Sequence, residues 1–389
     1  MEKVTGFVKR EKFMCIIVSL AAVLVLATGS ISEAVAYTDI KVIAIMWAFM
    51  IEIGGLNAMG LFDRAGLELS KKKNIEKVSL ILVAVSWVAA FIVTDYAVVL
   101  VMYAITFSMF KDMDAPNTES LMPKVLALET VAAMAGGMLT PMGNLVNISL
   151  YEITGIDTGE FIRTMLPYAV TGLAIVFLAT VPLLFKKADK AGETGGKKAV
   201  SQGFFSLTLT ELFAKSSTKY HSILIMYLML SVVTVLTTLG HLPYGIMIFI
   251  VAILILLSDR KGFTRADYPL LVSVAGMYII AGCLGKLADA YNGVLIYEEQ
   301  YKLMMVILSQ VLGNAPTGFT MAGRISDISG IIAASNVAGF GLISASITGM
   351  ASYRTVCGKA PKIMRPFLKY YILINVVILA ILMVVCFVS

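Results

Sequence analysis

Residues 136–148 form a stretch that an unbroken transmembrane helix does not tolerate. It reads Gly-Gly-Met-Leu-Thr-Pro-Met-Gly-Asn-Leu-Val-Asn-Ile, and the apolar sequence around it makes 125–150 long enough to cross a bilayer. Pro141 removes a backbone donor and clashes with the preceding turn. Unpaired backbone groups in hydrocarbon are costly, so a helix broken at membrane depth persists only where protein or a water-filled cavity receives it.

Two interpretations of this break are open. It is either a discontinuous helix whose freed N–H and C=O groups bind substrate or ion, or a kinked helix with a purely structural role. The pattern Thr-Pro-x-Gly-Asn within one turn favours a binding site. The candidate binding residues here are Thr140, Gly143, Asn144 and Asn147.

The composition indicates an integral membrane protein. The 389 residues have a mean hydropathy of +0.88, and only 14% of them are charged. The four cysteines have neither paired nor metal-ligand spacing, and we find no phosphate loop and no Ser/His/Asp set. We therefore expect no enzyme activity, no cofactor and no nucleic-acid partner.

The apolar segments divide into two kinds. Nine are near the length of a bilayer crossing: 13–35, 40–62, 125–150, 164–185, 220–239, 243–258, 268–288, 328–352 and 366–388. Two others, 78–110 and 302–323, each consist of two short apolar arms around a polar tip, which predicts re-entrant hairpins. A single long span is the alternative for 78–110.

The distribution of Lys and Arg between the two membrane sides distinguishes these alternatives. With nine crossings, two hairpins and the N-terminus in the cytoplasm, 26 Lys and Arg residues lie in the inside segments and five outside. A full crossing at 78–110 would move the lysine-rich segment 186–219 outside. We therefore predict a multi-pass protein of the cell (plasma or inner) membrane, with a cytoplasmic N-terminus and an external C-terminus.

The segment 186–219 divides the chain into two similar halves. It is polar and glycine-rich, as expected of a cytoplasmic linker, and 204–213 is either an interfacial helix or a short packed loop. The N-terminal repeat, 1–185, contains the hairpin 78–110 and the broken helix 125–150. The C-terminal repeat, 220–389, contains the hairpin 302–323 and a second broken helix, 328–352.

The order of features in the two halves predicts an inverted repeat. The span 40–62 matches 268–288, the tip at Asp95 matches the tip at Asn314, and four further crossings between the two spans reverse the direction of the second copy. Inverted repeats with paired broken helices are typical of carriers that work by alternating access. The predicted fold is an all-α membrane protein with two inverted halves.

The tips and breaks supply most of the remaining candidate site residues. Asp95 is the only carboxylate between Lys77 and Lys111, and a charge at membrane depth is a functional candidate, although it could also cap a short helix. Pro316 is expected to stop the helix at the second tip. Hydroxyl and amide groups in these segments complete the predicted set, which comprises Thr94, Asn314, Thr317, Ser344 and Ser346.

Three further polar residues lie within the apolar segments. Glu52 lies mid-span and is interpreted either as a proton relay or as a structural hydrogen-bonding group. Asn336 could equally make only an interhelical hydrogen bond. Glu129 is expected to be solvated at the cytoplasmic edge. No Arg or Lys lies mid-span, so an anion would be held by helix N-termini and neutral groups, with a co-bound Na⁺ near Asp95 and Asn144 as an alternative to H⁺.

These motifs resemble the ion-transporter superfamily that includes arsenite permeases, NhaD-type sodium/proton antiporters, and citrate and dicarboxylate carriers. The segment 140–147 is similar to the family's Thr-Pro-Ile-Gly-Asn motif, and 91–95 and 313–316 are similar to its hairpin tips. Thr94 and Gly313 stand where arsenite permeases have Asn, and dicarboxylate carriers have Ser-Asn-Thr at both tips, which this chain lacks. The resemblance implies dimers in some members.

We therefore expect a secondary transporter of a small anion or oxyanion acid, arsenite-like or carboxylate, coupled to H⁺ or Na⁺ through Asp95. A Na⁺/H⁺ antiporter and an anion channel are the alternatives.

Overall fold

A computed structural model describes residues 8, 10–111, 113, 115–185, 218–290 and 300–388, and these contain helices but no strands. The helices of the first half are α2 (Lys12–Thr28), α3 (Ile40–Ala58), α4 (Leu61–Ser70), α5 (Ile75–Ala90), α6 (Asp95–Phe110), α7 (Ala115–Ser120), α8 (Met122–Gly137), α9 (Leu145–Thr154) and α10 (Thr158–Phe185). Those of the second half are α12 (Thr218–Thr238), α13 (Tyr244–Ser258), α14 (Tyr268–Ala290), α15 (Tyr301–Leu312), α16 (Asn314–Ala322), α17 (Ile328–Val337), α18 (Ile347–Lys359) and α19 (Met364–Val388), with short 3₁₀ turns η1 (Arg260–Arg265), η2 (Ile343–Ala345) and η3 (Pro361–Ile363).

Five described helical segments are long and apolar enough to cross a membrane, namely Ile40–Ala58, Thr158–Phe185, Tyr220–Thr238, Tyr268–Ala290 and Pro361–Val388. Two more of the predicted spans form shorter apolar helices, α2 and α13. The predicted spans 125–150 and 328–352 are each split into two helices. The fold is therefore all-helical and apolar as predicted, while the count of nine crossings stays a prediction.

Each predicted hairpin is a pair of helices in contact. The segment 78–110 is not one continuous helix, because α5 ends at Ala90 and α6 begins at Asp95. At the second tip α15 ends at Leu312 and α16 begins at Asn314. The prediction that Pro316 stops a helix is wrong. It lies in the first turn of α16, where a missing N–H leaves no intrahelical bond unmade.

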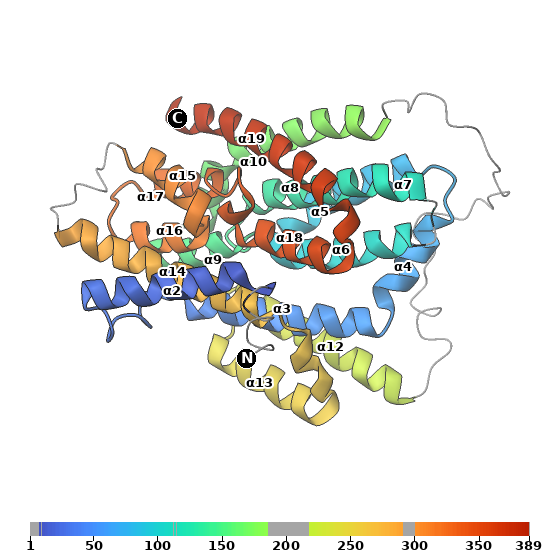
Figure 1. Ribbon diagram of the computed structural model, residues 1–389, viewed down its shortest axis with the longest axis horizontal. Helices are drawn as coiled ribbons and strands as arrows, with labels where there is room; N and C mark the ends of the chain where they lie inside the picture. The colour runs from blue at the N-terminus through green and yellow to red at the C-terminus, as the bar shows by residue number, and fades with distance from the viewer. Residues whose placement is uncertain are drawn as a thin grey trace.

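The hairpins and broken helices form the core of the molecule (Figure 1). Here α8 packs against α5, α6, α10 and α19, and α16 packs against α9 and α17. The helices α2, α3, α12, α13 and α14 lie on one side of this core, and α10 and α19 lie on the other. The two breaks, 138–144 and 338–346, are therefore largely covered by protein, with Leu342 exposed, as the cost of unpaired backbone favours.

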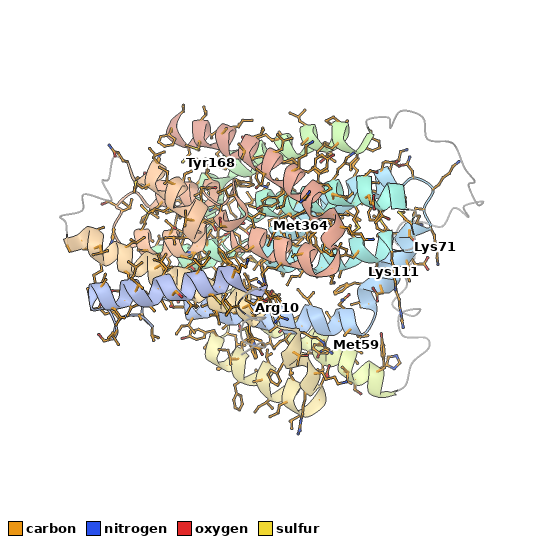
Figure 2. The ribbon with its side chains drawn as sticks, in the orientation of Figure 1. Arg10, Met59, Lys71, Lys111, Tyr168 and Met364 are labelled. Atoms are coloured by element: carbon orange, nitrogen blue, oxygen red, sulfur yellow. The ribbon has the colours of Figure 1, made fainter. Side chains whose placement is uncertain are left out.

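The predicted cytoplasmic side corresponds to one end of the long axis of the molecule. Figure 2 shows Lys71 and Lys111 at one end of this axis, although they belong to different predicted cytoplasmic segments. Arg10 lies nearer the middle, because α2 begins part-way along the axis. Most of the predicted linker, including 204–213, lies outside the described residues. The division into inverted halves stays a prediction.

Candidate functional site

The first turns of four helices meet at a small cavity between the two halves. Its volume is 20 Å³, about the space of one water molecule. The residues at these four helix starts are Asp95 of α6, Asn144 to Val146 at α9, Asn314 and Ala315 of α16, and Ser346 to Thr348 at α18. The rest of the wall comes from the ends of α8 and α17, namely Met134, Met138, Asn336, Gly339 and Phe340.

Asp95 is the charged residue in this wall. Its side chain is 5% exposed, and one carboxylate oxygen accepts a hydrogen bond of 2.6 Å from the backbone N–H of Tyr96. Thr348 lines the same cavity wall. The backbone N–H of Asp95 donates to the Gly143 carbonyl at 2.8 Å, which ties the first tip to the first break. The carboxylate is therefore not needed to hold the tip in place.

Three asparagines join the two halves behind the cavity. The Asn144 amide donates to Asn336 Oδ1 at 2.7 Å, and the Asn336 amide donates to Asn147 Oδ1 at 2.7 Å. Asn144 Oδ1 also accepts from the Asn147 backbone N–H and so caps α9. Asn147 in turn donates to the carbonyl of Gly137 at the end of α8 and to that of Thr140 inside the first break. Asn336 thus bonds across helices, and it also lines the cavity.

Gln310 holds the second break from outside it. Its amide donates to the carbonyls of Ala338 and Phe340, and its Oε1 accepts from the backbone N–H of Leu342. The Ser344 hydroxyl donates to the Gln310 carbonyl at 2.5 Å. Gln310 lies on α15, so the second hairpin and the second break are fixed to each other by side-chain bonds.

Four of the predicted site residues line the cavity: Asp95, Asn144, Asn314 and Ser346. The other six lie next to it and make structural contacts. Thr94 caps α6, Thr140 donates to the Phe91 carbonyl, Gly143 packs against Gly137, Asn147 joins the asparagine network, Thr317 donates to the Gly313 carbonyl, and Ser344 bonds Gln310. The part that any of the ten takes in binding stays a prediction.

Sequence reasoning missed Thr348 and Gln310. Thr348 lies two residues beyond the predicted Ser346, and Ser346 caps α18 by accepting from the backbone N–H of Gly349. Identifying Ser346 as an N-cap would have placed Thr348 in the first turn. Gln310 carried no such signal, because its role depends on which carbonyls a break 28 positions or more away in sequence presents to it.

Glu52 and Glu129 both lie away from the cavity wall. Glu52 of α3 accepts a hydrogen bond of 2.6 Å from Thr234 of α12. The prediction that Glu129 is solvated is wrong, because α8 is covered by six neighbouring helices and the Glu129 side chain is fully buried. It accepts a hydrogen bond of 2.6 Å from Thr106. Whether Glu52 relays protons stays a prediction.

Larger cavities lie on both sides of the site. One, of 400 Å³, is lined by Tyr96, Ala351 and Thr355, which follow the site residues along α6 and α18, and also by Arg265 and Lys359. It lies toward the predicted cytoplasmic side. The other, of 550 Å³, is lined by Pro141 and Met142 of the first break and by Lys41, on the predicted outer side. The site therefore lies between two larger spaces.

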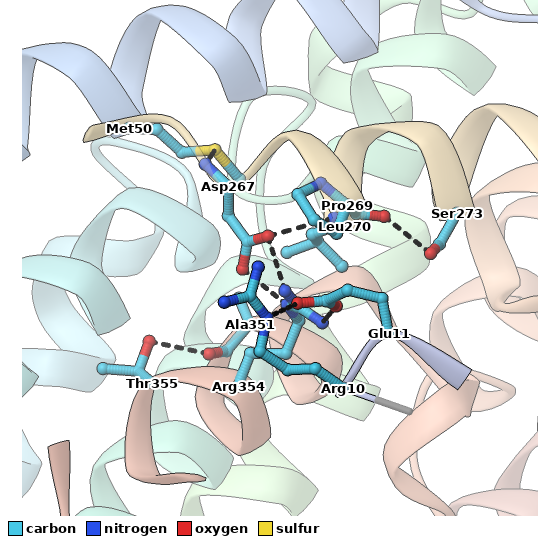
Figure 3. Close-up of polar contacts among 10 residues, drawn as sticks. All are labelled: Arg10, Glu11, Met50, Asp267, Pro269, Leu270, Ser273, Ala351, Arg354 and Thr355. Atoms are coloured by element: carbon cyan, nitrogen blue, oxygen red, sulfur yellow. Dashed lines mark hydrogen bonds and ion pairs between the residues drawn. The ribbon is translucent and has the colours of Figure 1, made fainter. Parts of the chain in front are cut away.

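An ion-pair cluster joins α18 to the neighbouring helices at the 400 Å³ cavity (Figure 3). Arg354 donates to Asp267 at 2.5 and 2.7 Å and to Glu11 at 2.9 Å. Arg265, in the same cavity wall, pairs with Asp259. Burial acts to raise the pKa of Asp259, but hydrogen bonds from Arg265 and Tyr227 outweigh it and lower the pKa of that carboxyl.

Comparisons with known proteins agree with this architecture. The family model described as citrate transporter matches residues 6–353. The uncharacterized transporter MJ0456 of Methanocaldococcus jannaschii is 22% identical over 317 residues, which is 81% of this chain and 80% of that protein. The inner membrane protein YbiR of Escherichia coli K12 is 23% identical over 325 residues, which is 80% of each chain. Two relatives of comparable length therefore match most of the sequence.

Proposed function

Since the chain belongs to the citrate transporter family, we propose that it carries a small carboxylate anion across the inner membrane, coupled to H⁺ or Na⁺. Membership of a transporter family also means that the protein is not expected to act as an enzyme. The departures at the two tips weakened the carboxylate interpretation of the sequence. The family match now favours it over an arsenite-like oxyanion.

The observation that carries this proposal is the meeting of four helix N-termini at one cavity. Each helix N-terminus carries a partial positive charge of about half an elementary charge, although Thr94, Asn144 and Ser346 already cap one N–H at three of the four. Together they favour an anion, although no Lys or Arg of the described residues lines the cavity. Ser346, Thr348 and Asn314 add neutral groups that can orient carboxylate oxygens.

Ion coupling of anion transport would follow from the Asp95 carboxylate in the cavity wall. An ionised Asp95 beside a bound anion would repel it strongly in a low-dielectric site. A proton on Asp95, or a Na⁺ ion bound between Asp95 and the amide oxygen of Asn144, removes that repulsion. Anion binding would therefore require the ion, which is the linkage that a coupled carrier needs.

The closed cavity fits alternating access better than a channel. A volume of 20 Å³ cannot hold a carboxylate anion, so the site must open toward one of the two larger cavities before substrate enters. Rocking or sliding of the hairpins and breaks against α2, α3 and α14 would expose it to each side in turn. A channel would instead need an open path across the site.

The direct test is uptake into proteoliposomes that contain the purified protein. Radiolabelled citrate, succinate and arsenite are offered separately, under imposed pH or Na⁺ gradients. We expect saturable uptake of a carboxylate that exceeds its equilibrium level only when an ion gradient is present. Gradient-driven arsenite uptake would change the substrate class. Collapse of a pH gradient by Na⁺ alone would indicate an antiporter, and uptake that never exceeds equilibrium would indicate a channel.

The proposed orientation has its own test. Lys71 and Asp157 are exposed and lie on the predicted inner and outer sides, respectively. In whole cells, a membrane-impermeant thiol reagent should label Asp157→Cys and not Lys71→Cys. In inside-out vesicles we expect the reverse, namely labelling of Lys71→Cys and not of Asp157→Cys. Labelling of both positions from the same side would contradict the nine-crossing topology and the external C-terminus.

A further inference from the structure

Glu129 is a carboxyl that the proposed transport cycle does not yet use. It lies in the middle of α8, one of the two helices that carry the first break, and its side chain is fully buried. One oxygen accepts a hydrogen bond of 2.6 Å from Thr106 of α6, and the other oxygen has no hydrogen-bonding partner. An isolated carboxylate in such surroundings would carry a large desolvation cost.

The charged and titratable groups around Glu129 do not offset that cost. Tyr103 of α6 faces it and is itself an uncharged donor, bonded to Thr130. Lys124, on the same helix, donates to the Leu183 carbonyl, and the ammonium of Lys359 on α18 lies 5.4 Å from the centre of the Phe107 ring. On α19 the Tyr371 hydroxyl points to the sulfur of Met134. No described cation is paired with Glu129.

The surroundings fit a proton and not a metal ion. A hard cation needs several oxygen ligands, and Thr106 is the oxygen partner that Glu129 has among the described residues. None of the described cavities is lined by Glu129, so no larger ligand has room beside it. A proton on the free oxygen removes the charge without needing space.

Hydroxyl groups connect this region to the candidate site. Thr130, the next residue, is bonded to the Tyr103 hydroxyl at 2.6 Å and to the Ser352 hydroxyl at 3.2 Å. Ser352 lies one turn beyond Thr348, on the same face of α18, and Thr348 lines the cavity together with Asp95. Thr355, one turn further on, lines the 400 Å³ cavity. A line of hydroxyls thus runs from Asp95 toward the predicted cytoplasmic side.

We propose that Glu129 is a second proton-binding site of the transport unit, which works beside Asp95 and exchanges its proton with the cytoplasmic side. The proposal rests on the proposed function, because it gives the carrier two protonatable carboxyls in one moving unit. When the site opens toward the 400 Å³ cavity, hydration of the Thr130–Ser352 region ionises Glu129 and releases the proton. Closure buries the carboxyl again and requires a proton to be taken up.

Glu52 provides the matched comparison within the same chain. It is also fully buried, it also accepts one hydrogen bond of 2.6 Å from a threonine, and its other oxygen also lacks a partner. It differs in place, because it lies between α3 and α12, outside the hairpins and breaks. The two glutamates therefore separate the effect of a buried acid from the effect of a buried acid beside the site.

The first measurement needs no substrate. Infrared difference spectra of the full-length protein in lipid nanodiscs are recorded on shifting the pH from acid to alkaline. We expect Glu129→Gln to remove one band of a protonated, buried carboxyl, and Glu52→Gln to leave that band in place. Thr106→Val should shift the same band, because it removes the hydrogen bond and keeps the acid. A spectrum unchanged by Glu129→Gln would overturn the proposal.

The second measurement tests whether the proton on Glu129 is coupled to transport. Radiolabelled citrate is the probe. Glu129→Gln should keep citrate counterflow and lose citrate accumulation driven by a pH gradient; the same assay on Glu52→Gln tests the separate prediction that Glu52 relays protons. Gradient-driven accumulation that is normal in Glu129→Gln, or is lost only in Glu52→Gln, would overturn the proposal. If the wild type moves no citrate, the substrate assignment fails, while the infrared result still decides whether Glu129 binds a proton.

Discussion

The two hairpin tips both lie at the candidate cavity and use their side chains differently. At the first tip, backbone groups make the bond to the neighbouring break, from the Asp95 N–H to the Gly143 carbonyl. At the second tip, the Asn314 side-chain amide donates to the Ser335 carbonyl of α17, the helix that precedes the second break, at 3.1 Å. The Asp95 carboxylate therefore remains available to a ligand, while the Asn314 amide is already engaged.

The two breaks are also held by different groups. The first is held from within its own helix pair, where Asn144 and Asn147 reach back to the Gly137 carbonyl at the end of α8, and by the backbone N–H of Asp95 at the tip of the first hairpin. The second is held by the side chain of Gln310, which belongs to the second hairpin. Two breaks in one fold are therefore stabilised in different ways, one by its own asparagines and a main-chain group of the hairpin, and the other by a hairpin side chain.

The largest effect is expected where the two halves are joined. Asn336→Ala removes the acceptor of Asn144 and the donor to Asn147, which leaves two buried polar groups unpaired at about 1–3 kcal/mol each. We expect transport to be abolished and the midpoint of thermal unfolding in detergent to fall by several degrees. Asn336→Asp, which keeps the acceptor for Asn144 but places a carboxyl opposite the Asn147 oxygen, is the comparison variant and should also lose stability. Wild-type uptake in Asn336→Ala would show that the halves are held together elsewhere.

The next effect separates the two tips. Asp95→Asn keeps the size and hydrogen bonding of the side chain but removes its ionisable charge. We expect counterflow of the substrate to persist and gradient-driven accumulation to be lost. Asn314→Asp, the reverse change at the other tip, should instead disturb binding, because it removes the donor to the Ser335 carbonyl. Unchanged uphill uptake in Asp95→Asn would mean that the available carboxylate is not the coupling group.

A smaller effect is expected from removing the side chain that hydrogen-bonds to the second break. Gln310→Ala frees three backbone groups of the second break, but the side chain is only half buried and water can partly replace it. We expect a transport rate about tenfold lower, corresponding to roughly 1.4 kcal/mol, with little loss of protein yield. Gln310→Glu keeps the acceptor for Leu342 alone and should be intermediate. A loss equal to that of Asn336→Ala would make the two breaks equally dependent on one side chain.

The sequence predicted the elements of this comparison better than their contacts. Pro, Gly and Asn in apolar segments located both breaks and the second tip, and the carboxylate of Asp95 located the first tip, because polar and helix-breaking residues in hydrocarbon mark interrupted helices. Pro316 was misinterpreted because the same residue ends a helix or begins one, depending on where the first turn starts. Glu129 was misplaced because its distance from a charged segment along the chain does not reveal the six helices that cover α8. Gln310 depends on tertiary geometry that no local pattern encodes.

The smallest effect tests whether Thr94 binds a ligand or only caps a helix. Its hydroxyl accepts from the Ala97 backbone N–H at 3.2 Å, whereas Gly313 at the other tip makes no side-chain cap. Thr94→Ala should therefore lower the free energy of unfolding by about 1 kcal/mol, the usual value of an N-cap, and Thr94→Ser should restore it. Thermal unfolding and uptake are measured on the same samples. Because Thr94 is not in the cavity wall, we expect the apparent affinity for the substrate to stay close to wild type in both variants.

A large loss of affinity in Thr94→Ala without a loss of stability would instead make Thr94 a direct ligand. The first tip would then contribute two side chains to the site and the second tip one, which would widen the difference between the halves.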